Sequence, residues 1–281
     1  MNSPLSDNVS PVPDIGLIIV GDEILSGKRA DKHLSKTIEL LGERGLTLSW
    51  ARYVGDDRRQ ITAALRDAFA QPGIVFSCGG IGATPDDHTR QCAAAALERS
   101  LVLHPQAREL ILERMRDVAA EQNLPYEPER ADNVHRLNMG VFPEGADIVP
   151  NPYNKIPGFD CTGSGGGRVF FLPGFPVMAW PMMAWALDTH CHTWFHRQTW
   201  VERSVIVFGA MEASLTPLME RIEAEHAGVK VFSLPSVDHP EYGRHIELGV
   251  KGEEGATQPA FDALKQGLSA FGAPMGPEMV R

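Results

Sequence analysis

Residues 74 to 90, IVFSCGGIGATPDDHTR, join an apolar run to three closely spaced glycines and two adjacent aspartates. Gly79, Gly80 and Gly82 leave the main chain uncovered, so that its N–H groups can converge on an anion. A helix that starts directly after them would add the positive end of its dipole. These residue types in this order suit a loop that binds phosphate.

The same stretch also has the composition of a helix N-terminus. Thr84 suits the N-cap position, Pro85 the first helical position and Asp87 the third. Helix capping needs one hydroxyl and one acid, so it accounts for neither the glycines nor Asp86. We therefore expect this segment both to cap a helix and to bind phosphate.

A second polar segment, VGDEILSGKRAD, follows an earlier apolar run. It supplies the carboxylates of Asp22 and Glu23 and the hydroxyl of Ser26. A plain polar loop, in which such side chains bond their own backbone, explains these residues equally well. The segment contains no G-x-G-x-x-G, which argues against a dinucleotide-binding dehydrogenase.

A third polar segment, YVGDDRRQIT, contains a pair of aspartates. Asp57 with Gln60 fits a helix-capping box, whereas Asp56 lies just outside it. Carboxylates beside a phosphate repel it unless a divalent cation lies between them. We therefore predict that Asp56 and Asp87 hold Mg²⁺, which bridges to phosphate oxygens.

The elements that must position these segments can be identified from hydrophobic periodicity. Apolar runs at residues 15–21, 46–55 and 73–80 are typical of strands, and a helical pattern follows each of them. This alternation predicts an α/β fold with a doubly wound, mostly parallel sheet and helices on both faces. Ligands collect beyond the carboxyl ends of such strands, where the three polar segments would meet.

The pattern divides the chain into three parts. Residues 1–13 are polar and contain prolines, which predicts a flexible tail before an α/β domain at 14–198. Within that domain, GSGGGR at 163–168 indicates a hairpin between two strands. Residues 199–281 show a β-α-β-β-α pattern, which predicts a small α+β domain for docking or dimerisation. We expect a homo-oligomer, either a dimer or a trimer.

Charge and hydropathy exclude two classes of partner. The chain of 281 residues has a formal net charge of −10 at pH 7 and no basic stripe, which argues against binding nucleic acid. The run VFFLPGFPVMAWPMMAWAL approaches membrane-spanning length, but its prolines favour a buried strand, a turn and a core helix. Because the N-terminus also lacks the features of a signal peptide, we expect a cytoplasmic protein without membrane contact.

Two other groups of residues could carry chemistry. DTHCHTWFH brings together His190, Cys191, His192 and His196, but a helix-end context without a glutamate base disfavours a metal site. Cys78 lies close to the glycines, and we expect it to be a small buried residue rather than a nucleophile.

Three segments, GDEILSGKRAD, VGDD and GGIGATPDDHT, together resemble the MoaB/MogA-like molybdopterin-binding family. The chain is most similar to the CinA branch, the N-terminal region of competence/damage-inducible protein A. VPNPYNKIPGF and FFLPGFP are similar to two later segments of that branch, so the resemblance covers most of residues 15–180. It implies binding of molybdopterin or an adenine nucleotide at the glycine-rich edge. Relatives such as MogA adenylylate molybdopterin with Mg²⁺, and CinA-type domains are associated with pyrophosphate hydrolysis of ADP-ribose.

The resemblance also implies roles for individual residues. Asp56 and Asp87 match the two acidic positions of metal-assisted phosphoryl chemistry, so we expect them to be metal ligands and catalytic residues. The glycines with Thr84 match a phosphate cradle, and Ser26 matches the first-loop position. The complete expected ligand-binding set is Asp22, Glu23, Ser26, Gly79, Gly80, Gly82, Thr84, Asp86, Asn151, Lys155 and Gly174.

The chain departs from the family pattern at three places. His33 stands where the family usually has asparagine, and Met178 stands where the CinA branch has glutamate. Asn154, Lys155 and Ile156 replace small residues. We expect these bulkier side chains to reshape the pocket, and Lys155 to add a phosphate contact.

Two functions stay open. The favoured one is a metal-dependent enzyme that acts on a phosphoanhydride, either as an ADP-ribose-type pyrophosphatase or in adenylyl transfer. The alternative is a non-catalytic module that binds, carries or senses a pterin cofactor, and the loss of glutamate at Met178 favours it. The amidohydrolase domain of many CinA proteins would follow Arg281, so we expect no nicotinamide-nucleotide deamidation from these residues.

Overall fold

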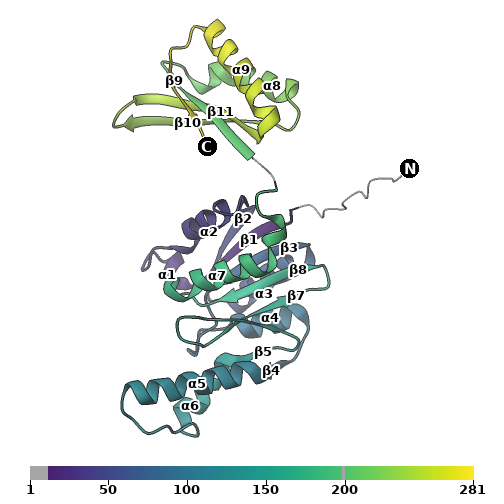
Figure 1. Cartoon of the computed structure of the whole chain (residues 1–281), viewed down its shortest axis with the longest axis vertical. Coiled ribbons are helices and arrows are strands. Elements are labelled where there is room, and N and C mark those ends of the chain that lie inside the picture. The colour runs from purple at the N-terminus through teal and green to yellow at the C-terminus, as the bar shows by residue number, and fades with distance from the viewer. Residues whose placement is uncertain (1–11, 198–199) are drawn as a thin grey trace, which may run out of the picture. The chain divides into compact units, whose positions relative to one another are not determined.

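The computed structural model describes residues 12–197 and 200–281, and the chain divides into two compact units between Phe195 and His196 (Figure 1). Most of the predicted tail at 1–13 lies outside the described residues. Val12, at the edge of the described part, packs against the core of the first unit.

The first unit is built on a six-stranded sheet with the strand order β2-β1-β3-β8-β7-β6. Strands β2, β1, β3 and β8 are parallel, β7 is antiparallel to β8, and β6 is antiparallel to β7. The strands are β1 (Asp14–Val20), β2 (Trp50–Val54), β3 (Gly73–Cys78), β6 (Asp147–Val149), β7 (Gly158–Thr162) and β8 (Gly167–Leu172). The register aligns the carboxyl ends of β1, β2, β3 and β8 at one edge, which confirms the expected mostly parallel sheet.

Helices cover both faces of this sheet. Leu17 and Ile19 of β1 pack with α2 (His33–Gly42) and α7 (Pro176–His190) on one face. Ile18 and Val20 point to the other face, towards α3 (Arg58–Ala70) and α4 (Thr89–Leu97). Because both faces of the central strands are buried, their sequences are continuously apolar rather than alternating.

The remaining elements of this unit are short apart from one helix. A two-stranded sheet pairs β4 (Leu101–Leu103) with β5 (Val141–Pro143), and α5 (Pro105–Glu121) and α6 (Ala131–Arg136) extend beyond it (Figure 1). The other short elements are α1 (Asp22–Leu25), η1 (Leu137–Gly140) and η2 (His192–Trp194). Among the described residues, no helix combines the length and apolar character that crossing a membrane requires.

The GSGGGR segment forms the β7–β8 hairpin, as predicted. Its turn is closed by the Gly163 N–H, which donates to the Gly167 carbonyl at 2.9 Å. A Cβ atom at Gly163 would meet the Phe69 carbonyl oxygen at 2.6 Å. The glycines therefore allow the hairpin to lie against the end of α3, which is a structural role.

Helix capping follows the sequence at α3 but not at α4. Asp57 Oδ1 accepts hydrogen bonds from the backbone N–H groups of Arg59 and Gln60, at 3.0 and 2.9 Å, which confirms the predicted cap. The cap predicted at Thr84 is wrong, because α4 begins only at Thr89. Asp87 Oδ2 instead accepts from the Thr84 N–H at 2.8 Å and from the Thr84 hydroxyl, which closes a separate turn before the helix.

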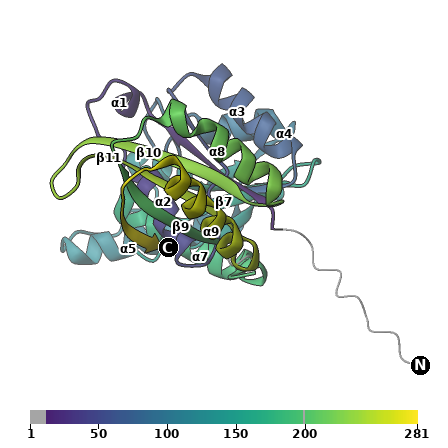
Figure 2. The same cartoon turned by 90° about the horizontal axis from the view of Figure 1, so that it is seen from above.

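The second unit is a small α+β domain with an antiparallel sheet of strand order β10-β11-β9-β12. Its elements are β9 (Trp200–Phe208), α8 (Glu212–Glu225), β10 (Lys230–His239), β11 (Gly243–Glu253), α9 (Glu254–Phe271) and β12 (Met275–Val280). Figure 2 shows α8 and α9 next to each other, and apolar residues of both pack on the same face of the sheet. Strand β12 was not predicted, because MGPEMV contains Gly and Pro and lies half-exposed at an edge.

Candidate functional site

A cavity of about 400 Å³ lies beyond the carboxyl ends of the parallel strands, and we call it the first cavity. Loops that follow β1, β2, β3 and β8 contribute to its lining, together with the loop that follows β6. Both expected metal ligands and eight residues of the expected ligand-binding set line it: Asp56 and Asp87, and Glu23, Gly79, Gly80, Gly82, Thr84, Asp86, Asn151 and Gly174. The doubly wound sheet therefore brings residues from distant parts of the sequence to one place, as the strand order requires.

Two expected residues after β1 do not line the first cavity. Asp22 pairs reciprocally with Asp56: its N–H donates to Asp56 Oδ2 at 3.0 Å, and its Oδ1 accepts from the Asp56 N–H at 3.1 Å. Ser26 forms the C-cap of α1, where its N–H donates to the Asp22 carbonyl at 2.8 Å. These residues therefore organise the loop, and Asp22 fixes the position of Asp56.

The glycine loop, residues 79 to 83, is packed against the start of α4. Gly79 and Gly80 have φ values of 108° and 70°, in the region that favours glycine. The Thr89 hydroxyl donates to the Gly79 carbonyl at 3.1 Å, and the Thr89 N–H donates to the Gly80 carbonyl at 3.0 Å. A Cβ atom at Gly80 would collide with the Thr89 hydroxyl. Backbone conformation and packing against Thr89 are thus sufficient reasons for glycine at both positions, without a ligand.

Arg90 holds the other end of the glycine loop. Its side chain is buried, and its guanidinium donates to the carbonyl oxygens of Ile81 and Gly82, the latter at 2.7 Å. Burial lowers the pKa of Arg90, and the negative charge of Asp87 opposes this shift. In a trans peptide the N–H points away from the preceding carbonyl, so the N–H groups of Gly82 and Ala83 point away from Arg90.

The amides of the glycine loop have no acceptor within the described chain. The N–H groups of residues 80, 81, 82 and 83 donate to no protein atom there, although both neighbouring amides are bonded. Gly79 N–H donates to the Leu172 carbonyl at 2.9 Å, and Thr84 N–H donates to Asp87. Consecutive unpaired amides of this kind form a concave donor surface that suits an anion.

The charges around the first cavity are mainly negative. Glu23, Asp56, Asp86 and Asp87 line it, and Arg29 is the single Lys or Arg among its lining residues in the described chain. Burial raises the pKa of Asp56, its hydrogen bond from Asp22 N–H lowers it, and the charges of Asp22, Glu23 and Asp86 raise it further. An anionic ligand would therefore need a cation to offset these carboxylates.

The residues present suit a Mg²⁺ ion that is shared with a ligand. Asp56 and Asp87 each use Oδ2 in a hydrogen bond to the protein, which leaves Oδ1 available on both. The described residues contain no group of three or more His, Cys, Asp or Glu side chains arranged for a metal. Two carboxylates are enough where phosphate oxygens and water supply the other positions, as is usual for Mg²⁺.

Asn151 organises the loop that closes the first cavity on the β6 side. Its Nδ2 donates to Asn154 Oδ1 at 2.8 Å and to the Ile156 carbonyl at 2.9 Å, and its Oδ1 accepts from Tyr153 N–H at 3.0 Å. The side-chain donors of Asn151 are therefore used within the loop. Its role is to hold Asn154 and Ile156, which both line the cavity.

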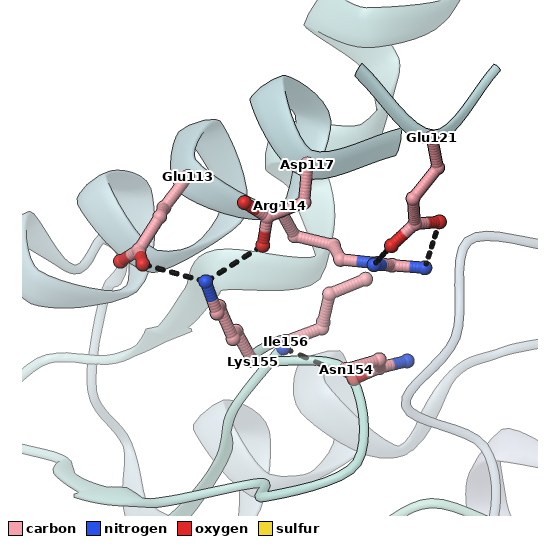
Figure 3. A network of polar contacts seen from close by, with 7 residues as sticks. All are labelled: Glu113, Arg114, Asp117, Glu121, Asn154, Lys155 and Ile156. Atoms are coloured by element: carbon pink, nitrogen blue, oxygen red, sulfur yellow. Dashed lines mark hydrogen bonds and ion pairs between the residues drawn. The ribbon is translucent and has the colours of Figure 1, made fainter. Parts of the chain in front are cut away.

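Lys155 lies outside the first cavity, which corrects the expectation of a phosphate contact. Its backbone has a φ of 65°, and its Nζ lies 2.6 Å from Glu113 Oε1 and 2.6 Å from Asp117 Oδ2 (Figure 3). The two acids are one helical turn apart on α5, so both reach the same ammonium. Lys155 anchors the loop to α5, while Ile156 packs against the buried apolar cluster that includes Met115.

The structure adds residues that sequence patterns did not identify. Arg29 and Phe175 line the first cavity, with the Arg29 guanidinium 5.9 Å from the centre of the Phe175 ring. Phe175 is 56% exposed, although it is aromatic. In the sequence, only the phenylalanine of LPGFP could have indicated a role for Phe175, and nothing indicated one for Arg29.

The residues that depart from the family pattern lie at or next to the first cavity. Met178 lines it, and Asn154 Nδ2 approaches the Met178 sulfur at 3.3 Å. His33 is buried, and its Nε2 lies 3.1 Å from the carbonyl oxygen of Gly174. His33 therefore supports the loop after β8, because a ring N–H can donate to that carbonyl.

The contacts and burial of His190, Cys191 and Cys78 indicate structural roles. His190 Nδ1 lies 3.0 Å from Arg168 Nη1 and therefore accepts from it, because a guanidinium can only donate. Cys191 is fully buried, and so is Cys78. Burial raises the pKa of the Cys78 thiol, which suits a small packing residue and not a nucleophile.

Comparison with known proteins identifies relatives for most of the chain. A sequence family described as "Probable molybdopterin binding domain" matches residues 16–190. A CinA-like protein of Anaeromyxobacter dehalogenans is 33% identical over 163 residues, which cover 58% of this chain and 37% of that protein. Protein TV0584 of Thermoplasma volcanium is 27% identical over 254 residues, which cover 89% of this chain and 93% of that protein.

Solved structures are also similar over this region, and one of them shares more than a quarter of its residues with this chain. The crystal structure of CinA with unknown function from Thermoplasma acidophilum has a TM-score of 0.52 and 26% identity. The match covers 64% of this chain and 98% of that one. The chain spans only about a third of the length of the Anaeromyxobacter relative, so similarity over this part does not give the chain the activity of that whole protein.

The raised pKa of Asp56 predicts how its replacement changes stability. Because the folded-state pKa lies above the unfolded value, ionised Asp56 disfavours folding at neutral pH, and this cost disappears below the unfolded pKa. We expect Asp56→Asn to raise the melting temperature of the metal-free protein at pH 7 but not at pH 3. Asp67→Asn, which removes an exposed partner of Arg52, is the control that should not stabilise. A lower melting temperature for Asp56→Asn at pH 7 would contradict this account.

The two cations near the first cavity should have different effects on ligand affinity. We expect Lys155→Met to change the dissociation constant of an adenine nucleotide by less than about threefold, because Lys155 is paired with Glu113 and Asp117. Arg29→Met should weaken it roughly tenfold, because it removes the cation from the lining. Titration calorimetry measures both, and the reverse order of effects would show that Lys155 contacts the ligand.

Proposed function

The chain belongs to the molybdopterin-binding domain family, in its CinA-like branch, and we propose that its first unit binds a phosphorylated pterin or an adenine nucleotide together with Mg²⁺. We propose further that it cleaves or forms a phosphoanhydride in that ligand. The unpaired amides of residues 80–83 carry this proposal, since these residues line a cavity whose charged side chains are mostly carboxylates. Donors for an anion beside acids for a cation suit a diphosphate that is bound with its metal.

The acids and the amides would act on different parts of the diphosphate. Asp56 and Asp87 would hold Mg²⁺ through their Oδ1 atoms, with Asp86 adding negative charge nearby. The metal, when bound, neutralises the phosphate oxygens and polarises the bond under attack. The amides around Gly80 and Gly82 would stabilise the charge that develops on the phosphoryl oxygens. Water is the nucleophile in hydrolysis, and a pterin phosphate takes its place in adenylyl transfer.

The apolar part of the first cavity suits a flat ring. Met139, Ile156, Phe175 and Met178 contribute apolar side chains to the lining, and Phe175 is the single aromatic residue in the lining within the described chain. Its exposed ring, with Arg29 beside it, offers a face for stacking of an adenine or pterin ring. The ring would therefore bind against Phe175 and the diphosphate against the amides of residues 80–83, within the same cavity.

A non-catalytic binding or carrier function is the second candidate. Met178 replaces the glutamate of the family pattern, and its sulfur contacts Asn154. No histidine is among the lining residues in the described part of the chain. Without a histidine or the family's glutamate, the general base would have to be one of the carboxylates that offset the metal, which favours retention of the ligand over turnover.

Turnover of ADP-ribose distinguishes the two functions. With Mg²⁺ we expect release of AMP and ribose 5-phosphate, and Asp87→Asn should lower kcat at least about 100-fold, because it removes a metal ligand from the site. Asp67→Asn, on the exposed face of α3, should leave kcat unchanged. Product release is followed by chromatography with and without a chelator. Tight binding of a pterin or nucleotide without any turnover would support the carrier function instead.

Phe175 should determine affinity for the ring of the ligand. We expect Phe175→Leu to weaken binding of AMP roughly tenfold, because it removes the stacking face. Binding of inorganic pyrophosphate with Mg²⁺ should not change, because it has no ring. Val177→Ala is a matched control, since Val177 is 52% exposed and does not line the cavity. An equal loss of AMP affinity in both variants would exclude stacking on Phe175.

A further inference from the structure

A second cavity of about 450 Å³ adjoins the first. Ala83, Thr84 and Asp87 line both cavities, so the segment from Ala83 to Asp87 is a shared wall. The other sides of the second cavity come from the first residue of α3, the beginning of α4, and α6 with η1. These elements are far apart in sequence, and no motif pointed to this cavity.

The second cavity has the opposite charge balance to the first. Arg58 and Arg90 line it, and Asp87 is its single lining acid in the described chain. Arg90 donates its hydrogen bonds to carbonyl groups of the glycine loop, whereas Arg58 forms no ion pair with a carboxylate among the described residues. The Asp87 Oδ2 atom is already occupied by the Thr84 N–H and hydroxyl. An anion that enters this cavity therefore meets the open guanidinium of Arg58 and a single carboxylate, so we expect it to bind without a metal.

Hydrogen bonds fix which donors remain for a ligand. Arg58 Nη2 lies 3.1 Å from His88 Nδ1, and a guanidinium can only donate, so His88 carries its proton on Nε2. The remaining N–H groups of Arg58 and the His88 Nε2–H have no acceptor in the described chain. Both side chains belong to the lining, together with the amide of Gln91.

Hydrogen bonds connect α6 and η1 to the shared wall of the second cavity. His135 Nε2 lies 3.3 Å from the Ala83 carbonyl, and Asn138 Nδ2 lies 3.3 Å from His135 Nδ1. The consistent arrangement has His135 donating to Ala83 and accepting from Asn138. This chain of contacts ties the shared wall to α6 and η1, so the wall is supported from the second cavity as well as from Arg90.

We propose that the second cavity binds a phosphate group, held by Arg58 and His88, without a metal ion. A planar guanidinium with several open N–H groups suits the tetrahedral oxygens of phosphate. Binding in the second cavity does not depend on Mg²⁺, on Asp56 or on the identity of the ring in the first cavity. The phosphate is either free, as inorganic phosphate or a phosphomonoester, or a distal phosphate of a ligand that reaches across the shared wall.

Calorimetric titration of the whole chain with inorganic phosphate in the presence of a chelator tests the proposal. We expect one metal-independent site, weakened at least about tenfold by Arg58→Gln and partly restored by Arg58→Lys. Arg59→Gln is the matched control, because Arg59 is exposed, follows directly in α3 and does not line the cavity. Unfolding curves check that each variant is folded.

Three results would overturn the proposal: no binding of phosphate, equal binding to wild type and Arg58→Gln, or binding that requires Mg²⁺ and is lost in Asp56→Asn. Metal-independent binding that survives Asp56→Asn supports it, even if ADP-ribose is not turned over. A competition experiment then identifies the source. Simultaneous binding of phosphate and Mg-ATP indicates a separate phosphate, whereas mutual exclusion indicates that a distal phosphate of the nucleotide occupies the second cavity.

Discussion

The hydrogen bonds that Thr89 and Arg90 make to the glycine loop determine what the first cavity can bind. Four consecutive carbonyl groups, from Gly79 to Gly82, accept hydrogen bonds from these two residues. The amides of residues 80–83 are left without a partner in the described chain. Burying a guanidinium costs free energy unless it is paired, so Arg90 stabilises the loop only while the carbonyls stay turned inward. The same contacts thus pair the buried guanidinium of Arg90 and leave a surface of free amides that suits an anion.

Electrostatic repulsion is the second property of this sheet edge. The loops after β1, β2 and β3 each bring carboxylates to the first cavity, and the charges of Asp22, Glu23 and Asp86 contribute to the raised pKa of Asp56. Such a cluster is unfavourable in the free protein and becomes favourable when a cation enters. On the other side of the shared wall, Arg58 lacks an acidic partner in the described residues. The two cavities therefore differ in which ligand groups they would accept with and without a metal.

The loop after β6 shows how departures from a family pattern can change shape without adding a charge to the site. Asn151 organises the loop, and Lys155 attaches it to α5, so that Ile156 and Asn154 face the cavity. Met178 then contacts Asn154 from α7. The bulk that the sequence adds here becomes part of the cavity lining, while the new ammonium does not. The residue types of a loop therefore indicate the bulk that it adds to a cavity better than they indicate where its charged groups lie.

The sequence by itself determined the strand-helix alternation, the parallel sheet, the cap at Asp57 and the meeting of three polar segments at one sheet edge. Each of these depends on local periodicity or on the rule that parallel strands end together, which a single sequence contains. Only the tertiary structure decided that Lys155 points towards α5, that α4 begins at Thr89, and that Arg58, His88 and His135 surround one cavity. A left-handed backbone conformation at a lysine, and contacts between distant residues such as His33 and Gly174, which are 141 positions apart, leave no local pattern. Side-chain direction is set by packing between distant segments, and that information exists only once the chain has folded.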